Sequence, residues 1–158
     1  MARRTHEKTP HAKMLLVALR SVGYTNETAI ADILDNSISG AATEIELYFD
    51  WDNRRIIIAD NGFGMDYQEL MDAMEIGSAD PNEMRPSEDL GRFGLGMKTA
   101  SFSMAKKLLV ISKKNSTISN AEWNLNTVAS EDKWEISEYD ESEISMILES
   151  IDTYTQYN

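Results

Sequence analysis

The sequence lacks cysteine, has only three prolines and contains no long apolar run. Without cysteine the chain can form neither a disulfide framework nor a thiolate metal site. No apolar segment approaches the roughly 20 residues that a membrane-spanning helix needs, so we expect no contact with a membrane. The short apolar run at 14–19 is bracketed by Lys13 and Arg20 and no cleavage site follows it, which argues against a signal peptide. The sequence therefore predicts a cytoplasmic globular protein.

Positive charge is also scarce. Fifteen lysine and arginine residues against 27 aspartate and glutamate residues give a formal net charge of -12. A charge of this sign repels phosphate backbones, so we expect no direct binding of nucleic acid. At 158 residues the chain is long enough to build its own core, and we expect one domain over 1–158.

The apolar pattern predicts five helices, at about 9–21, 26–39, 66–76, 95–104 and 141–151. Thr9 and Pro10 are typical of a helix start, and Gly23 can take the left-handed conformation that ends the first helix. Asp66 followed by Glu69 predicts a capping box for the third helix.

The strands are expected to pair mainly as antiparallel neighbours. Alternating apolar residues at 45–49 and the isoleucine run at 55–59 predict a hairpin whose second strand is the more buried. Further strands are expected at 108–111, 117–125 and 133–139. This order favours an α/β (α+β) fold, a two-layer sandwich in which helices cover a mixed, mainly antiparallel sheet.

Three segments carry residues suited to chemistry, and the first is the second expected helix. Asp32 and Asn36 lie four residues apart, so a carboxylate and a carboxamide share one helix face. Ile30, Ile33, Leu34 and Ile38 supply the core stripe. An amphipathic helix whose polar residues merely face water explains the same pattern.

The second segment is Asp60-Asn61-Gly62-Phe63-Gly64-Met65, which follows the isoleucine strand directly. A carboxylate at a strand end can accept a hydrogen bond from an adenine amino group, and glycines let the backbone approach a planar ligand. An ordinary Asp-Asn-Gly turn is the alternative.

The third segment contains three glycines that run into a helix start. Consecutive backbone N-H groups and the helix dipole would suit a triphosphate, although a tightly packed glycine loop is also possible. The segment reads Gly91, Arg92, Phe93, Gly94, Leu95, Gly96, Met97, Lys98 and Thr99.

In this order the three segments resemble the N box and the two glycine motifs of GHKL ATPases, which include gyrase B, the heat-shock chaperones, histidine kinases, MutL and the microrchidia proteins. The similarity covers about residues 28–103. It is greatest to the chaperone and microrchidia branches. The resemblance implies a Bergerat ATP-binding fold that binds ATP and Mg²⁺.

The resemblance also implies roles for individual residues. Asn36 would coordinate the Mg²⁺ that bridges the phosphates, and Asp60 would bind the adenine amino group, with Gly64 and Met65 lining the base pocket. Gly62 would be a further cofactor-binding residue. The segment from Gly91 to Thr99 would wrap the phosphates, where Lys98 either reaches the terminal phosphate or faces solvent. Residues 77–90 correspond to the ATP lid.

Two departures from the family pattern stand out. Asp32 stands where the chaperone and MutL branches usually have the glutamate that activates water, so we expect Asp32 to be the catalytic base, with Asp35 as a possible contributor and slow hydrolysis as an alternative. The residues after Ile151 contain no Gly-Thr pair of the kind that completes the family's adenine site. We therefore expect the chain to be the N-terminal part of a longer protein.

The functional prediction is an ATPase domain in which Mg-ATP closes the lid and drives homodimerisation of the longer protein. An ATP-sensing module without significant hydrolysis is the alternative. A histidine-kinase-like phosphotransfer domain is less favoured, because His6 and His11 are the only histidines and no phosphoacceptor segment surrounds them.

Overall fold

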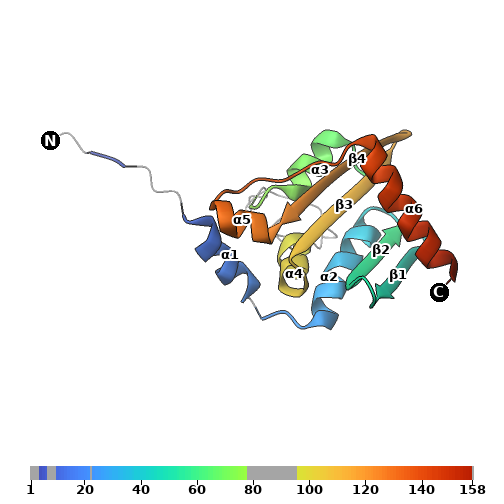
Figure 1. Ribbon diagram of the computed structural model, residues 1–158, viewed down its shortest axis with the longest axis horizontal. Helices are drawn as coiled ribbons and strands as arrows, with labels where there is room; N and C mark the ends of the chain where they lie inside the picture. The colour runs from blue at the N-terminus through green and yellow to red at the C-terminus, as the bar shows by residue number, and fades with distance from the viewer. Residues whose placement is uncertain (1–3, 7–9, 22, 78–95, 158) are drawn as a thin grey trace.

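The computed structural model describes residues 4–6, 10–21, 23–77 and 96–157 (Figure 1). Within these ranges it contains six helices and four strands: α1 (Ala12–Arg20), α2 (Asn26–Ser39), β1 (Ile45–Asp50), β2 (Arg55–Asp60), α3 (Tyr67–Met74), α4 (Gly96–Met104), β3 (Lys107–Lys114), β4 (Thr117–Asn124), α5 (Leu125–Glu131) and α6 (Glu141–Tyr157). None of these helices is both long and apolar enough to cross a membrane.

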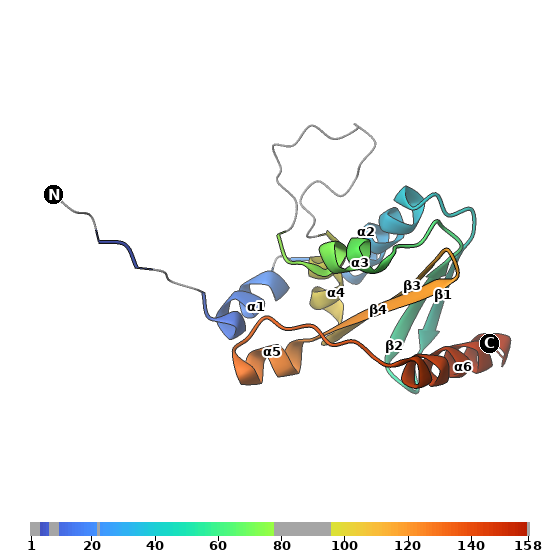
Figure 2. The ribbon, with the colours of Figure 1, turned by 90° about the horizontal axis from the view of Figure 1, so that it is seen from above.

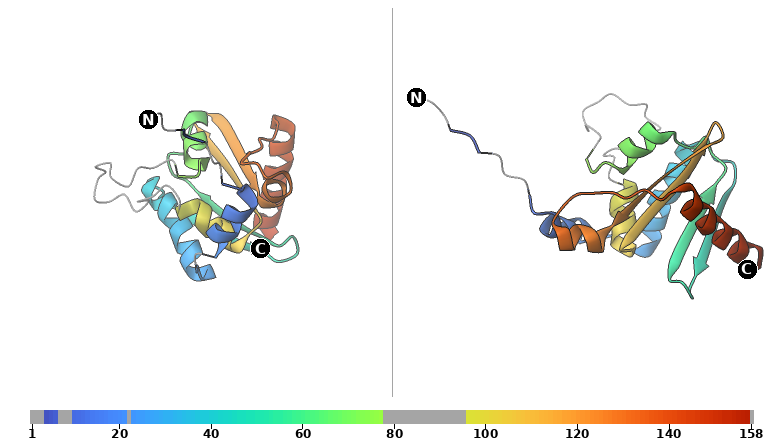
Figure 3. Two further views of the ribbon diagram at one scale, coloured as in Figure 1. Left: turned by 90° about the vertical axis from the view of Figure 1, so that its left-hand side faces the viewer. Right: turned by 45° about the horizontal axis from the view of Figure 1, so that its top comes forward.

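Helices cover the strands from two sides. Figure 2 shows α2, α3 and α4 on one side of the strands and α6 on the other, and the left view of Figure 3 gives the same division. The expected mixture of helices and antiparallel strands is thus confirmed. The single mixed sheet is not: in the described ranges, β1 pairs only with β2 and β3 only with β4, giving two antiparallel two-stranded sheets.

The reason lies in the segment that follows β2. Instead of pairing with β3 as a strand, this segment hydrogen bonds back to residues 40–44, where Phe63 N donates to Gly40 O at 2.9 Å. It reaches β3 through a side chain, because Met65 N donates to Ser112 Oγ at 2.6 Å. The segment after β2 is thus joined to β3 by a bond to a serine side chain, and not by the backbone hydrogen bonds that would make one continuous sheet.

The strand expected at 133–139 does not form. Only Ser137 pairs with β4, through two backbone hydrogen bonds with Glu122 of 2.7 and 3.0 Å. At Tyr139 the side chain of Asn120 replaces the backbone partner, accepting from Tyr139 N at 2.8 Å and donating to Tyr139 O at 3.0 Å. This carboxamide satisfies both backbone groups, so no further ladder is needed there.

A helix that the sequence pattern did not predict, α5, follows β4 without a loop. Asn124 ends the strand and caps the helix, accepting from Asn126 N at 3.1 Å. Leu125 and Val128, three residues apart, are both buried. The prediction extended β4 to Leu125 because the apolar residues continue past the strand end.

The predictions for α2, for the capping box of α3 and for the β1–β2 hairpin are confirmed. Two burial predictions are wrong. Ile38 of the expected core stripe is 57% exposed, and Ile56 of the strand expected to be buried is 42% exposed. The exposure of Ile56 follows from the small size of the hairpin: two strands alone cannot cover the apolar side chains near its tip.

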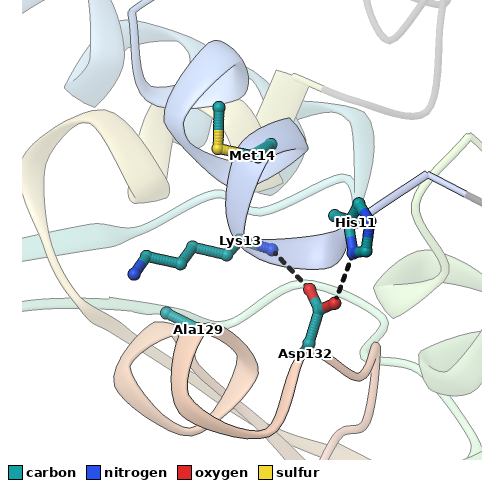
Figure 4. Close-up of a pocket in the computed structure, with 5 residues that line it drawn as sticks. All are labelled: His11, Lys13, Met14, Ala129 and Asp132. Carbon is teal, nitrogen blue, oxygen red and sulfur yellow. Dashed lines mark hydrogen bonds and ion pairs between the residues drawn. The ribbon is translucent and has the colours of Figure 1, made fainter.

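The start of α1 also differs from the prediction. The helix begins at Ala12 rather than at Pro10, while Thr9 lies outside the described residues. Asp132, at the end of α5, supplies the missing cap: its carboxylate accepts from Lys13 N at 3.2 Å and lies 2.7 Å from His11 Nδ1 (Figure 4). A pocket opens beside this contact, and none of the predicted site residues lines it. The predicted end is confirmed, since Gly23 has a φ of +87°.

The core gathers around Trp123 on β4. Its indole lies edge-on to Phe102 of α4 and to Trp134, with ring centroids 6.3 and 6.0 Å apart, and its Nε1 donates to Met74 O at 3.0 Å. The remaining buried members of this cluster come from α1, α3, β4 and α5: Ala12, Leu16, Leu70, Met74, Ala121, Leu125 and Val128. The core thus holds α3 and α4 in place, and these helices flank residues 78–95.

Candidate functional site

The polar face of α2 carries the first two predicted site residues. Thr25 caps the helix in a reciprocal pair with Thr28, which fixes where its turns begin. Asp32 is half-buried and Asn36, one turn later, is exposed. The Nδ2 group of Asn36 donates to the backbone carbonyl of Asp32 at 2.7 Å. Among the described residues no hydrogen bond uses the Oδ1 atom of Asn36, so this oxygen can face a ligand.

Asp32 is held by a residue that the sequence analysis missed. The hydroxyl of Tyr24, in the connection between α1 and α2, donates to Asp32 Oδ2 at 2.6 Å. This hydrogen bond, and secondly burial, raise the pKa of Tyr24, while the nearby side chain of Thr99 on α4 opposes the rise. Tyr24 therefore stays protonated and acts as a donor to Asp32. No periodicity or motif in the sequence marks it.

Asp60, at the end of β2, is tied to α2. Ser37 Oγ donates to Asp60 Oδ2 at 2.8 Å, and Gly62 N donates to Asp60 Oδ1 at 2.9 Å. Ser37 follows Asn36 directly in the chain and is buried. One hydrogen bond thus places the carboxylate predicted to bind adenine beside the helix predicted to bind Mg²⁺. Sequence reasoning missed Ser37, since a serine beside a site residue carries no signal of its own.

The loop after Asp60 packs against backbone on both sides. A Cβ atom on Gly62 would lie 2.6 Å from Gly40 O, and one on Gly64 would lie 2.2 Å from Lys113 O. Asn61 Oδ1 accepts from Thr43 N at 2.9 Å and from Glu44 N at 3.0 Å. The glycines are therefore required by close backbone approach, and the loop is fixed before any ligand arrives.

The third predicted segment is described only from Gly96 onward. Gly91, Arg92, Phe93, Gly94 and Leu95 lie outside the described residues, as does the predicted lid except Gly77. The rest of the segment forms the first turn of α4, the helix that packs along α2. The Thr99 hydroxyl donates to Gly96 O at 3.3 Å. Gly96, Met97, Lys98 and Thr99 thus lie on the helix that flanks the Asp32 face.

Lys98 is 2% exposed, so the alternative that it faces solvent is wrong. Its Nζ donates to the carbonyl of Ala73 at 2.6 Å, in the last turn of α3. Trp123 donates to the next carbonyl, that of Met74, so Lys98 and Trp123 together supply hydrogen bonds to the last two carbonyl groups of α3. Burial lowers the pKa of Lys98 from 10.5 to about 8, and the nearby Glu75 opposes this only in part.

We expect the ionisation of Lys98 to make stability depend on pH. Between about pH 8 and pH 10.5 the unfolded lysine holds its proton and the folded one releases it, so the free energy of unfolding rises with pH over this window. The contribution is at most about 1.4 kcal/mol per pH unit. Urea unfolding should show this rise as a difference between the wild type and Lys98→Met. Lys114→Met, which changes a lysine whose pKa is raised by Glu69, should retain it.

No group of three or more histidine, aspartate or glutamate side chains in the described part of the chain is arranged to hold a metal ion. A divalent cation at Asn36 would therefore take most of its ligands from phosphate oxygens and water. The donor at hand, a carboxamide oxygen on an exposed helix face, suits Mg²⁺, which usually keeps several waters and binds through few protein ligands.

Comparison with known proteins identifies the class. Residues 24–157 match the family described as histidine kinase-, DNA gyrase B-, and HSP90-like ATPase, and the chain belongs to this family. The predicted family resemblance is thereby confirmed.

Two curated relatives are microrchidia-type ATPases. The chain is 29% identical over 118 residues to ATPase morc-1 of Caenorhabditis elegans, covering 72% of the chain and 14% of that protein. It is 28% identical over 96 residues to ATPase MORC2B of Mus musculus, covering 58% of the chain and 9% of that protein. The chain thus spans only a small part of the length of these relatives.

Proposed function

We propose that this chain binds Mg-ATP and hydrolyses it to ADP and phosphate. The observation that carries the proposal is the hydrogen bond of 2.8 Å from Ser37 to Asp60, because it joins the adenine-reading carboxylate to the helix that bears Asp32 and Asn36. Family membership supports the choice of nucleotide. The site would use Asp60 with Gly62, Gly64 and Met65 for the base.

The phosphates would lie at the start of α4, because the backbone N-H groups of a helix's first turn and the helix dipole favour negative charge. We assign them to the segment from Gly91 to Thr99. Asn36 Oδ1 would hold Mg²⁺, which supplies a positive charge to the phosphate oxygens when bound. Lys98, engaged with Ala73, would act by fixing the first turn of α4 to α3.

In the hydrolytic step Asp32 would accept a proton from the attacking water. The water oxygen then bonds to the γ-phosphorus while the bond from that phosphorus to the ADP oxygen breaks, and ADP leaves with the electron pair. The proton on Asp32 returns to solvent. Asp32 contributes by orienting and deprotonating the water, and the amides of the glycine segment by stabilising phosphoryl charge.

We further propose that residues 77–90 act as the ATP lid and that Mg-ATP promotes homodimerisation of a longer protein. Both ideas follow from the family resemblance. The lid falls outside the described residues except Gly77.

Asp60→Asn tests the binding proposal. Asparagine keeps the size of the side chain but replaces one charged carboxylate oxygen, a strong hydrogen-bond acceptor, with an N-H donor. We therefore expect the affinity for Mg-ATP to fall about 10- to 100-fold. The preference for ATP over GTP should shrink as well, because guanine presents an acceptor where adenine has its amino group. Calorimetric titration with ATP, ADP and a nonhydrolysable analogue, with and without Mg²⁺, measures both effects.

Asp52→Asn is the matched control, since Asp52 is an exposed aspartate in the hairpin turn. It should bind as the wild type does. Folded wild-type protein that fails to bind ATP at millimolar concentration, or equal loss in both variants, would contradict the assignment of Asp60.

An ATP sensor without hydrolysis is the second candidate. The presence at position 32 of aspartate, which is one methylene shorter than the family's usual glutamate, favours it. Binding of Mg-ATP without turnover in the wild type would support this reading.

A further inference from the structure

Tyr24 lies beside residues of two helices of the candidate site, α2 and α4, although it belongs to none of the three motifs. It lies in the connection that precedes α2, is half-buried, and donates to Asp32 Oδ2 at 2.6 Å. The side chain of Thr99, in the first turn of α4, lies close enough to the phenol to lower its pKa. The phenol therefore stands between the carboxylate assigned to the water and the helix assigned to the phosphates.

The reach of Asp32 makes this contact important. A general base must lie within hydrogen-bond distance of the proton that it removes, and a misplacement of about 1 Å can cost a large factor in rate. The shorter side chain of aspartate leaves less freedom to adjust. A second residue that fixes its rotamer can offset that loss, as partners of catalytic side chains commonly do.

We propose that Tyr24 is a positioning residue that holds the carboxylate of Asp32 for proton abstraction. The proposal rests on the hydrolytic function proposed above. Tyr24 transfers no proton itself: the proton of the attacking water goes to Asp32, and the phenol keeps its own. Oδ2 of Asp32 accepts the hydrogen bond from the phenol, and proton abstraction is assigned to Oδ1.

A purely structural role is the competing explanation, because Tyr24 precedes the N-cap residue Thr25 and could simply fasten the start of α2. The two roles differ in what they change. A structural role alters stability and nucleotide affinity, whereas a positioning role lowers kcat while the dissociation constant for Mg-ATP stays nearly constant.

The test is a double-mutant cycle with Tyr24→Phe, Asp32→Asn and the combination, each measured for phosphate release and for Mg-ATP binding. We expect Tyr24→Phe to lower kcat about 10- to 100-fold with binding changed by less than about 2-fold, a loss of the size seen when an orienting partner is removed. The double variant should be no slower than Asp32→Asn alone, because Tyr24 acts through Asp32.

Tyr67→Phe is the control. Its hydroxyl donates to the carboxylate of Glu138 at 3.0 Å, so the variant removes the same kind of bond on an exposed surface of α3. It should match the wild type in kcat and in binding.

The outcomes separate the two proposals. A wild type that binds Mg-ATP without turnover overturns the hydrolytic function and the role of Tyr24 with it. Wild-type turnover that Tyr24→Phe leaves unchanged overturns only the role of Tyr24. Weakened binding in Tyr24→Phe, or additive losses in the double variant, assign Tyr24 a structural role and also overturn the proposal.

Discussion

Replacing Asp32 with asparagine is expected to lower the rate of ATP hydrolysis about 100- to 10,000-fold while leaving the affinity for Mg-ATP nearly unchanged. Asparagine has almost the same shape and its Oδ1 can still accept from Tyr24, but it cannot take a proton from water. Phosphate release under single-turnover and steady-state conditions measures the rate, and calorimetry measures the affinity. A sensor would show no turnover to lose.

Two further variants sharpen this prediction. Asp52→Asn, in the exposed hairpin turn, should hydrolyse ATP at the wild-type rate. Asp35→Asn examines the neighbouring carboxylate on α2, which is half-buried. If Asp35→Asn abolishes turnover and Asp32→Asn does not, the catalytic base has been assigned to the wrong residue of this helix.

Gly64→Ala is expected to lower the free energy of unfolding by about 2 to 5 kcal/mol. The residue has a φ of +66°, where an L side chain costs about 1 to 2 kcal/mol. Its Cβ would also lie 2.2 Å from the backbone oxygen of Lys113, and forcing extra atoms into a packed site costs about 1 to 3 kcal/mol. Such a loss is a large part of the about 5 to 15 kcal/mol of a typical domain.

Gly77→Ala separates the two contributions. Gly77 has a φ of +82°, and no heavy atom of the described residues lies within 4 Å of an added Cβ, so we expect only the conformational cost of about 1 to 2 kcal/mol. Urea unfolding monitored by tryptophan fluorescence should rank wild type, Gly77→Ala and Gly64→Ala in falling order of stability. Equal losses in the two variants would mean that β3 yields to the added methyl group.

Local signals in the sequence predicted much of the fold. The apolar pattern located α2, and the capping pair Asp66 and Glu69 located α3 because a cap acts within one helical turn. The alternation at 45–49 located the hairpin because strand side chains alternate. The predictions failed where a distant group decided the outcome. Asn120 takes the place of a strand partner at Tyr139, where the last strand was expected, and Asp132 at the end of α5 caps α1.

The candidate site shows the same division. The motifs indicated Asp32, Asn36 and Asp60 correctly as polar residues on α2 and at the end of β2, and their roles remain predictions. The contacts that position them could not be read from spacing, because Tyr24 and Ser37 follow no pattern. Lys98 is the clearest case: its motif suggested a phosphate or solvent, but the fold buries the amine against a carbonyl 25 residues away in the chain.

The hydrogen bonds between residues 40–44 and the loop after Asp60 restrict how this domain can change in length. The side chain of Asn61 accepts hydrogen bonds from two successive backbone N-H groups, those of Thr43 and Glu44. One residue added to either segment would shift Asn61 out of register and break both hydrogen bonds. The hairpin tip at 51–54 is exposed and is free of this constraint. Insertions and deletions in related proteins should therefore gather at the hairpin tip. The spacing from Asn36 to Gly40 should stay constant, and the spacing from Gly40 to Asp60 should change only through the length of the hairpin.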